Sequence, residues 1–487
     1  MARAIPPSRL RTVNAAPLNG RGDYVLYWMI AARRVRWNFA LEHALHRARE
    51  LGKPLVILEA LRCDYPWASE RLHRFILEGM ADNAQALRQA PVLYHPYVEE
   101  RRGAGRGLLE TLGEAACLVV TDDFPAFFLP RMVEAAGEKL SVRLEAVDGN
   151  GLLPLSAAPQ AYPSAYAFRR FLQNNLPGHL ADKPQADPLA GPALPQLASL
   201  PQRVLDRWPA AWARLDATDF ALHELPIDQR VAISATRGGS QAARARLAVF
   251  LDARLQVYAQ RRNEPELNVT SELSPYLHFG HLSVHEIFAR LAEQERWDFG
   301  SLGPQSKGQR AGWWGMSENA EAWLDQLVTW RELGYNFCRH RTDYERYESL
   351  PDWALATLER HAEDPRPYLY DLEDFEQART HDPLWNAAQR QLLREGGIHN
   401  YLRMLWGKKI LEWSRTPREA LAVMIELNNK YALDGRDPNS YSGIFWCLGR
   451  YDRPWPERPI YGKIRSMSSE STARKFTLEG YLRRYGP

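Results

Sequence analysis

Short apolar runs alternate with amphipathic stretches over the first third of the chain. The apolar runs that predict strands lie at residues 24–30, 54–61, 91–96, 117–122 and 142–147. The stretches between them have helical spacing, at residues 35–51, 69–89, 107–113 and 128–140. Continuous apolar strands that alternate with helices are typical of a parallel sheet covered on both faces. We therefore predict a doubly wound, Rossmann-like α/β domain at residues 22–150.

The pattern changes after residue 150. Residues 151–226 are rich in Pro, Ala and Leu, with a short helical pattern at 166–174, so we predict a long interdomain connector there. From residue 227 onward the periodicity is helical nearly throughout, and it includes a long helix expected at 241–261. This predicts an all-helical domain at residues 227–487. Residues 1–21 form a basic N-terminal arm that we expect to be frayed, with an ordered arm as the alternative.

Composition narrows the class of protein. A chain of 487 residues with 45% hydrophobic and 25% charged residues is typical of a soluble globular protein of two or three domains. Apolar runs fall short of the roughly 20 residues that a membrane span needs, and the N-terminus lacks the apolar segment of a secretory signal. The four cysteines are scattered without metal-ligand spacing. We therefore expect a cytoplasmic protein, nucleoid-associated in a prokaryote, with reduced thiols and no metal.

Charge is distributed unevenly along the chain. The net charge is only +3, so the chain as a whole is not an electrostatic binder of nucleic acid. Between Cys447 and Pro487, however, nine Lys and Arg residues accompany four Asp and Glu residues, which leaves +5. A basic surface of this kind suits a phosphate backbone. A solvated helix face is the alternative interpretation.

The region at residues 397–455 holds the densest aromatic and turn signals. Trp406 and Trp413 lie seven residues apart, roughly two helical turns, so their indoles share one helix face. The next segment, residues 434–439 (DGRDPN), concentrates turn formers and acids. By themselves these features also fit core packing of the tryptophans and a capped loop.

Four motifs carry a family resemblance. Residues 399–404 (HNYLRM), 434–439 (DGRDPN) and 452–455 (DRPW) resemble the class II cyclobutane pyrimidine dimer photolyases. Upstream, residues 270–280 (TSELSPYLHFG) look like the flavin-phosphate segment of the wider photolyase and cryptochrome superfamily. The motifs stand in family order and near family spacing, and the resemblance runs from about residue 22 to the C-terminus.

The resemblance implies a deoxyribodipyrimidine photo-lyase that repairs cyclobutane pyrimidine dimers in DNA. In that family, blue light drives electron transfer from reduced FAD to a flipped-out dimer. The implied protein is a monomer that binds dimer-containing DNA and needs no obligate protein partner or membrane. A deazaflavin or folate antenna is a further possible cofactor of the α/β domain, although Ile30 stands where the family often has Gln.

The resemblance also implies a set of flavin-binding residues. The set is Tyr258, Thr270, Ser271, Glu272, Leu273, Ser274, Arg331, Asn400, Arg403, Asn428 and Asp434. Arg403 and Asp434 are expected to form a charge pair beside the isoalloxazine, where an Arg favours the anionic reduced form. Asn428 is expected to contact flavin N5, with Asn439 as the second choice. Hydroxyls followed by a proline at 270–275 would also suit a helix start that binds a diphosphate.

The catalytic residues that the resemblance implies are Gln326, Trp330, Met404 and Asn428. Gln326 and Trp330 lie four residues apart on one helix face, and Met404 is expected to pack in the lesion pocket. The family commonly has a Glu near the position of Gln326. An amide can donate and accept hydrogen bonds but carries no charge. If the helix aligns one turn later, Glu332 is the acid instead.

An electron relay and a DNA interface complete the implied site. The relay would run from the flavin through Trp406 to Trp385, with Trp413 near the route. The DNA-binding residues would be Trp446, Asp452, Arg453 and Trp455, at the mouth of the pocket. In class II enzymes the loop that corresponds to residues 452–455 fills the hole left by a flipped dimer.

Two other functions fit the same fold. A cryptochrome-like blue-light photoreceptor often needs a C-terminal extension, whereas this chain is expected to stop soon after the helical core. A (6-4) photoproduct photolyase wants histidines in its pocket, and His399 is the one histidine between residues 397 and 455. Without the resemblance, the sequence predicts a two-domain protein that combines an α/β and an all-α domain with a basic tail, with nucleotide binding as a candidate activity.

Overall fold

The structure is a computed structural model that describes residues 4–487 and separates into two compact units. The first, here called the α/β unit, comprises Met1–Pro159, Asn175–Ala248 and Glu272–Arg296. The second, the helical unit, comprises Gln160–Asn174, Val249–Ser271 and Trp297–Pro487. The chain therefore passes between the two units several times, at positions other than the divisions expected after residues 150 and 226.

The α/β unit is built on a six-stranded sheet with the order β1-β6-β5-β2-β3-β4. Its strands are β1 (Leu10–Thr12), β2 (Tyr24–Met29), β3 (Leu55–Leu61), β4 (Leu93–Val98), β5 (Ala116–Asp122) and β6 (Leu144–Val147). The strands β2 to β6 pair in parallel, and β1 pairs with β6 in the antiparallel sense. This confirms the predicted parallel α/β fold, because each of the five expected apolar runs forms a strand.

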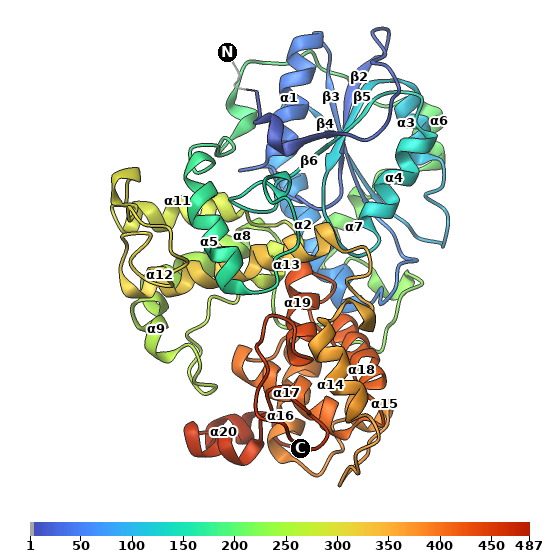
Figure 1. Ribbon diagram of the computed structural model, residues 1–487. Coiled ribbons are helices and arrows are strands. Elements are labelled where there is room, and N and C mark those ends of the chain that lie inside the picture. Colours follow the sequence, from blue (N-terminus) through green and yellow to red (C-terminus); the bar gives the residue numbers. More distant parts are fainter. Residues whose placement is uncertain (1–3) are drawn as a thin grey trace. The chain divides into compact units, whose positions relative to one another are not determined.

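Helices cover both faces of this sheet, as the continuous apolar strands require. They are α1 (Phe39–Leu51), α2 (Glu70–Leu87), α3 (Leu108–Glu114) and α4 (Leu129–Lys139). Along β2, Val25 and Tyr27 belong to the buried cluster that contains α1 and α2 side chains. The alternating residues Tyr24 and Leu26 belong to the cluster that contains α3 and α4 side chains. Figure 1 shows α1 and α4 on opposite sides of the sheet.

The remaining helices of the α/β unit come after the last strand in the sequence. They are α6 (Gln202–Arg207), α7 (Trp212–Asp216), α8 (Ser240–Val249), α10 (Ser274–His278) and α11 (Val284–Gln294).

The connector expected at residues 151–226 packs against the α/β unit. Trp208 within it is fully buried, and its indole N–H donates to the Ala104 carbonyl at 2.9 Å.

The expectation of a frayed N-terminal arm is wrong for the described residues. Leu10 pairs with Val147 in β1 and β6, and the buried Arg9 side chain donates to the carbonyls of Gly151 and Leu152 at 3.1 and 2.7 Å. Its guanidinium also lies 3.8 Å from the Asp148 carboxylate. A guanidinium presents five donors, so Arg9 satisfies several buried acceptors at once and fixes the arm to the sheet.

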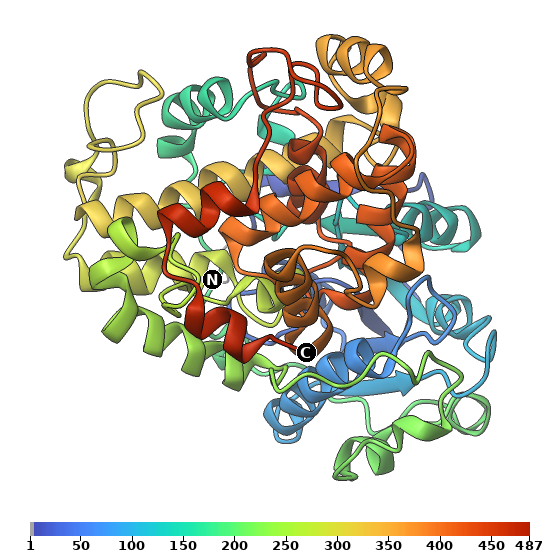
Figure 2. The same cartoon turned by 90° about the horizontal axis from the view of Figure 1, so that it is seen from below.

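The helical unit consists mainly of packed α-helices. They are α5 (Ala165–Asn175), α9 (Tyr258–Arg261), α12 (Glu318–Leu324), α13 (Arg331–His340), α14 (Asp352–Arg360), α15 (Leu372–Glu376), α16 (Pro383–Glu395), α17 (Asn400–Trp413), α18 (Pro417–Tyr431), α19 (Pro438–Cys447), α20 (Ser469–Lys475) and α21 (Glu479–Arg484). A single large buried cluster includes side chains of α14 to α19. The last two helices, α20 and α21, are drawn red in Figure 2. In the described part of the chain, every helix is too short or too polar to cross a membrane.

The long helix expected at 241–261 is wrong in detail. The chain is helical there, but α8 passes into a π-helical segment, Phe250–Arg254, and a 3₁₀ turn before α9 begins at Tyr258. Phe250 packs against Tyr258 at 5.6 Å and against Trp323 at 4.4 Å between ring centroids. In an unbroken α-helix, residues eight apart are separated by about 12 Å along the helix axis. The irregular turns let Phe250 and Tyr258 share one packing surface.

Replacement of Arg9 by Ala should lower the free energy of unfolding by about 3 kcal/mol, because it leaves buried carbonyls and Asp148 without their cation. Denaturant unfolding of the full chain measures this. Arg11→Ala is the matched control, since Arg11 is 30% exposed in its pairs with Asp123 and Glu134 and should cost less than about 1 kcal/mol. Equal losses for the two variants would contradict a buried anchoring role for Arg9.

Candidate functional site

The helix expected to face the lesion contains a π-helical segment, Asp325–Trp330, between α12 and α13. Such segments are rare and are often found at functional sites. Gln326 lies in it half-buried, and within the described chain its amide forms no hydrogen bond with another residue. Glu332, the alternative acid, is buried and only 4% exposed. The structure therefore leaves the Gln326 amide, rather than the Glu332 carboxylate, accessible to a ligand.

Trp330 and Trp446 form a stacked indole pair. Their ring centroids lie 4.4 Å apart with an interplanar angle of 15°, and Tyr451 meets Trp330 edge-on at 6.4 Å. The Trp446 indole N–H donates to the Asp452 carboxylate at 3.0 Å. Both indoles are only partly buried. Residues expected separately at the pocket wall and at the pocket mouth are thus in direct contact.

Met404, on α17, contacts the residue that follows Trp446 in the sequence. Its sulfur is 4.0 Å from the Cys447 sulfur, and Cys447 directly follows Trp446 in α19. Helices α17 and α19 pack together, and α19 also packs against α13. Trp330, Trp446 and Met404 thus come from helical segments that pack against α19 or belong to it, whereas Arg453 and Trp455 are exposed on the loop that follows α19.

Arg331 takes part in a buried network that ties α13 to α19. Its guanidinium donates to the Tyr335 hydroxyl at 3.0 Å and lies 4.4 Å from the centroid of that ring. The Tyr335 hydroxyl donates to the Asp437 carboxylate at 3.1 Å. Burial and the nearby Asp437 charge hold the pKa of Tyr335 well above its ordinary value, so the phenol stays protonated. Asp437 in turn caps α19 by accepting the Asn439 N–H.

The Arg403–Asp434 charge pair forms as expected. Arg403 in α17 reaches Asp434, before α19, with N–O distances of 3.1 and 3.4 Å. The Arg403 side chain is 28% exposed and that of Asp434 is 12% exposed. The pair is partly desolvated, which strengthens its electrostatic interaction, yet the guanidinium keeps an accessible edge. Its role beside an isoalloxazine stays a prediction.

The orientation of the Asn428 amide follows from its neighbours. Its Nδ2 donates to the Ser440 hydroxyl at 2.6 Å and to the side-chain oxygen Oδ1 of Asn429 at 3.3 Å. That Asn429 oxygen also accepts the Arg436 backbone N–H at 2.9 Å, so a flipped Asn428 amide would set two oxygens against each other. Both Asn428 donors are therefore occupied, and the group left for a ligand is its oxygen, an acceptor.

The predicted flavin-phosphate residues are divided between the two compact units. Tyr258, Thr270 and Ser271 belong to the helical unit, whereas Glu272, Leu273 and Ser274 belong to the α/β unit. The hydroxyls of this segment do not cap the next helix, because the N-cap of α10 is the buried Leu273 and no side chain caps this helix. The expected binding of a diphosphate here stays a prediction. The adjacent Glu272 adopts a positive φ of 55° and pairs with Arg246 at 2.5 Å. Thr270 accepts a bond from Arg254 through its backbone carbonyl.

The remaining residues of that set differ in exposure. Tyr258 is buried, which raises its pKa above the ordinary value. Asn400 is exposed at the start of α17, and its amide donates to Asn263 at 3.4 Å. Their contacts with a flavin stay predictions.

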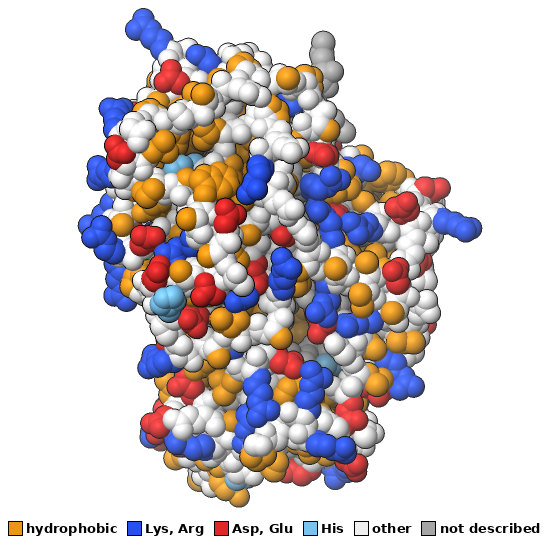
Figure 3. Space-filling view, turned by 180° about the vertical axis from the view of Figure 1, so that it is seen from behind, with side chains coloured by type: hydrophobic (Ala, Val, Ile, Leu, Met, Phe, Trp, Pro, Cys, Tyr) orange, Lys and Arg blue, Asp and Glu red, His pale blue; other side chains and the backbone are white. Residues whose placement is uncertain are grey.

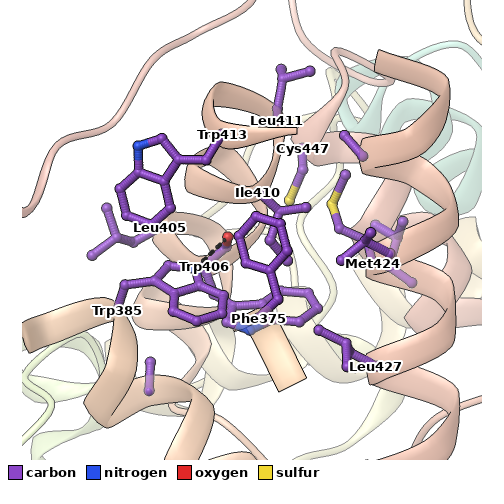
Figure 4. Close-up of a cluster of buried hydrophobic side chains, with 14 of the residues drawn as sticks. Phe375, Trp385, Leu405, Trp406, Ile410, Leu411, Trp413, Met424, Leu427 and Cys447 are labelled. Atoms are coloured by element: carbon purple, nitrogen blue, oxygen red, sulfur yellow. Dashed lines mark hydrogen bonds between the residues drawn. The ribbon is translucent and has the colours of Figure 1, made fainter. Parts of the chain in front are cut away.

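The three expected relay tryptophans form one contiguous buried group. Trp385 in α16 donates its indole N–H to the Trp406 backbone carbonyl at 3.0 Å, and its ring lies 6.0 Å from that of Trp413. Trp406 and Trp413 both lie on α17 and are at most 2% exposed. Figure 4 shows the three indoles together with Phe375, and its dashed line marks the bond from Trp385. A relay along this route stays a prediction.

Sequence reasoning missed Gln389, which contacts the first relay residue. Its amide oxygen accepts the Trp406 indole N–H at 2.9 Å, and its Nε2 donates to the Glu376 carbonyl at 3.3 Å. Gln389 is fully buried. It lies one helical turn after Trp385 in α16, and this spacing is the signal that could have identified it.

The loop after α19 carries the exposed part of the predicted DNA interface. We call Asp452–Lys463 the C-terminal loop; it folds back on itself, with Trp455 N–H donating to the Lys463 carbonyl at 2.9 Å and a bridge between Arg458 and Gly462. Arg465 lies 5.3 Å from the Trp455 ring centroid. Elsewhere, Lys and Arg side chains are interspersed with Asp and Glu on the face shown in Figure 3.

The polar groups of the helical unit, one cation and one hydrogen-bond acceptor, fit a flavin. A partly exposed cation on α17, Arg403, and a free amide acceptor on α18, Asn428, lie on two helices that pack together. Such groups suit an anionic ring system with hydrogen-bonding edges. Among the described residues, no cluster of three or more His, Cys, Asp or Glu side chains is arranged to hold a metal ion.

The chain is similar over its whole length to curated proteins named deoxyribodipyrimidine photo-lyase. It is 35% identical to that of Methanothermobacter thermautotrophicus, over 99% of this chain and 98% of that protein. It is 31% identical to that of Potorous tridactylus, over 96% and 82% of the two chains. It is also 31% identical to that of Arabidopsis thaliana, over 98% and 92%. No family model matches the chain.

Solved structures share the fold. A bacterial class III photolyase from Agrobacterium tumefaciens superposes with a TM-score of 0.67 at 18% identity, over 97% of this chain and 87% of the other. A cryptochrome from Synechocystis sp. PCC6803 gives a TM-score of 0.68 at 16% identity, over 95% and 88%. At these identities the likeness concerns the architecture alone.

The stacked indole pair should be energetically coupled. In a double-mutant cycle of Trp330→Ala and Trp446→Ala, we expect a coupling of about 1 kcal/mol in the free energy of unfolding, since aromatic contacts add to area burial. Denaturant unfolding of the four proteins measures it. The cycle of Trp330→Ala with Trp455→Ala, whose indole is 40% exposed, is the control and should give a coupling near zero. Similar couplings in both cycles would contradict the stack.

Proposed function

Because the chain belongs to the deoxyribodipyrimidine photo-lyase family, we propose that it repairs cyclobutane pyrimidine dimers in DNA by light-driven electron transfer from reduced FAD. The observation that carries this proposal is the stack of Trp446 on Trp330, which lies in a π-helical segment that also holds Gln326, whose side-chain amide is unengaged within the described chain. Flat, partly exposed aromatic surfaces with one polar group suit a pyrimidine pair taken out of the base stack. We assign the chain to the class II branch on its motifs.

The cofactor would supply the light absorption and the transferable electron, while the protein supplies binding, orientation and electrostatics. Arg403 would hold the negative charge of the reduced ring, and Asp434 would keep that guanidinium oriented. The Asn428 oxygen would accept a hydrogen bond from a ring N–H, because both of its amide hydrogens are already engaged. Asn428 therefore offers neither an acid nor a second cation.

The lesion would lie against the indoles. Extrusion of a dimer costs a few kcal/mol, and less for damaged pairs whose stacking is already weak. Trp330 and Trp446 would offset part of this cost by contact with the pyrimidine rings, and Met404 would fill the space beside them. Gln326 can donate one hydrogen bond and accept another at the pyrimidine carbonyl and N–H edges. Arg453 and Trp455, exposed on the C-terminal loop, would occupy the gap in the duplex.

The tryptophan group would restore the active redox state of the cofactor. Trp406 donates its indole N–H to an amide oxygen and Trp385 donates its own to a backbone carbonyl. These acceptors are neutral and weakly basic, so an oxidised indole would keep its proton. The positive charge could then pass between indoles without a coupled proton transfer.

Light-dependent repair tests the proposal. The reduced protein, illuminated with blue light, should restore intact thymines in an oligonucleotide that carries one thymine dimer, and the same sample in darkness should not. Gln326→Glu should raise the yield, because a carboxyl group can also protonate or hydrogen-bond a developing negative charge. Glu332→Gln is the matched control. A flavin-containing protein that leaves the dimer untouched in light would overturn the repair function and favour a photoreceptor.

Replacement of Trp406 by Phe should block the photoreduction of oxidised FAD, because it removes the indole expected to donate first. Absorbance of the bound flavin under illumination with an external reductant measures the rate. Trp455→Phe changes an exposed tryptophan and should leave the rate unaltered. Photoreduction of Trp406→Phe at the wild-type rate would exclude Trp406 from the relay.

A further inference from the structure

One histidine holds the outer part of the C-terminal loop, while Lys463 at the end of the loop donates its backbone N–H to the Thr357 hydroxyl of α14 at 3.0 Å. His361, directly after α14, lies with Nε2 at 2.9 Å from the Glu457 carboxylate and Nδ1 at 2.7 Å from the Asp364 carboxylate. Asp364 also accepts the backbone N–H of Ile460 at 2.7 Å. One imidazole ring thus connects a loop carboxylate to a second carboxylate that itself binds the loop backbone.

This arrangement requires a charged imidazole. A neutral ring has one N–H donor and one acceptor, whereas an imidazolium has two donors. Both ring nitrogens of His361 face carboxylate oxygens at hydrogen-bond distance, and a deprotonated nitrogen would repel its partner. The bonds to Glu457 and then Asp364 raise the pKa of His361 above its ordinary value. The two carboxylates are in turn held ionised, with lowered pKa values.

Nearby cations help to keep the two carboxylates ionised. Arg360 lies 3.5 Å from the Glu457 carboxylate, and Lys463 and Arg366 act on Glu457 and Asp364 respectively as more distant charges. Gly462 packs against the imidazole, because a Cβ at this position would lie 2.8 Å from His361 Cδ2. The ring therefore sits between α14 and the loop with negative partners on both edges.

Among the side chains of the exposed stretch at residues 453–459, Glu457 makes the polar contacts with the rest of the protein. Within the described chain, no other side chain between Arg453 and Pro459 forms a hydrogen bond or ion pair. Arg453 and Trp455, the two residues expected to enter the duplex, lie four and two residues before Glu457. If the contact of Glu457 with His361 is lost, this stretch keeps its internal backbone bonds, its contact with Arg465 and the longer pair of Glu457 with Arg360.

The geometry points to His361 as a positioning residue that holds the C-terminal loop in place for damaged DNA through an imidazolium shared by Glu457 and Asp364. This inference rests on the proposed function, because it assumes that the loop meets the lesion. His361 itself need not contact DNA. An ordered loop binds without first losing conformational freedom, so the anchor should strengthen binding of dimer-containing duplex.

The contribution of the His361 anchor to DNA binding should fall as the pH rises. The pKa of His361 is raised in the folded protein, so the contribution of the anchor is fully present below the unfolded value of about 6.5. It is lost as the pH rises through the raised folded pKa. The preference for dimer-containing duplex over undamaged duplex should therefore be constant in mild acid and fall on the alkaline side.

The test is a double-mutant cycle on DNA binding. His361→Gln, Glu457→Gln and the double variant are compared with the wild-type protein, with fluorescently labelled duplexes with and without one thymine dimer, from pH 6 to pH 9. Each single variant should reduce the preference for the damaged duplex roughly threefold to tenfold at pH 6, as expected of a partly exposed charge-assisted pair. The double variant should lose no more than either single variant. The preference of His361→Gln should not change with pH in this window.

The control is His223→Gln, which removes an exposed histidine of the α/β unit and should keep the wild-type preference and pH profile. Thermal midpoints of all variants check that they fold. Suppose that the wild-type protein prefers the damaged duplex and that folded His361→Gln shows the same preference and the same pH profile. That result would overturn the anchor and leave the proposed function intact. A wild-type protein with no preference for damaged duplex would overturn both.

Discussion

The bond from the Trp385 indole N–H to the Trp406 carbonyl oxygen fixes α16 against α17, and the predicted site depends on the placement of α17. A buried indole N–H without an acceptor would cost roughly 1–3 kcal/mol, so this contact restricts how α17 can rotate about its axis. The Trp406 N–H is satisfied by Gln389 on α16 as well. Because Arg403 and Met404 lie on the same helix, the packing of the tryptophans also sets the direction of the cation and of the thioether.

The opposite side of α17 is held by a lysine. Lys408 is fully buried and donates to the Cys447 carbonyl, at the C-terminal end of α19, at 2.6 Å. Burial lowers its pKa to about 8, while the negative end of the helix dipole favours its charged form. Trp446 precedes Cys447, so this contact also places the indole that stacks on Trp330. Two of the tryptophans proposed for the electron relay, Trp406 and Trp413, thus share α17 with Met404, which is proposed to face the lesion.

The sequence allowed the α/β fold and the motif residues to be predicted, because both leave local patterns. Contacts between distant residues leave none. Arg9 meets carbonyls about 140 residues away, so nothing near it indicated that the N-terminal arm is ordered. The break in the helix expected at 241–261 follows from the packing of Phe250 on Trp323, which no helical periodicity encodes. His361 and Glu457 stand 96 residues apart, and each alone resembles an ordinary surface residue.

The most direct test of the account is the fluorescence lifetime of the reduced flavin bound to the protein, measured with and without DNA. If excited reduced flavin donates an electron to a dimer held against Trp330 and Trp446, saturating dimer-containing duplex will shorten that lifetime. Undamaged duplex at the same occupancy will leave it unchanged. An unaltered lifetime with the damaged duplex demonstrably bound would contradict electron transfer to the lesion and, with it, the assignment of this surface as the site of repair.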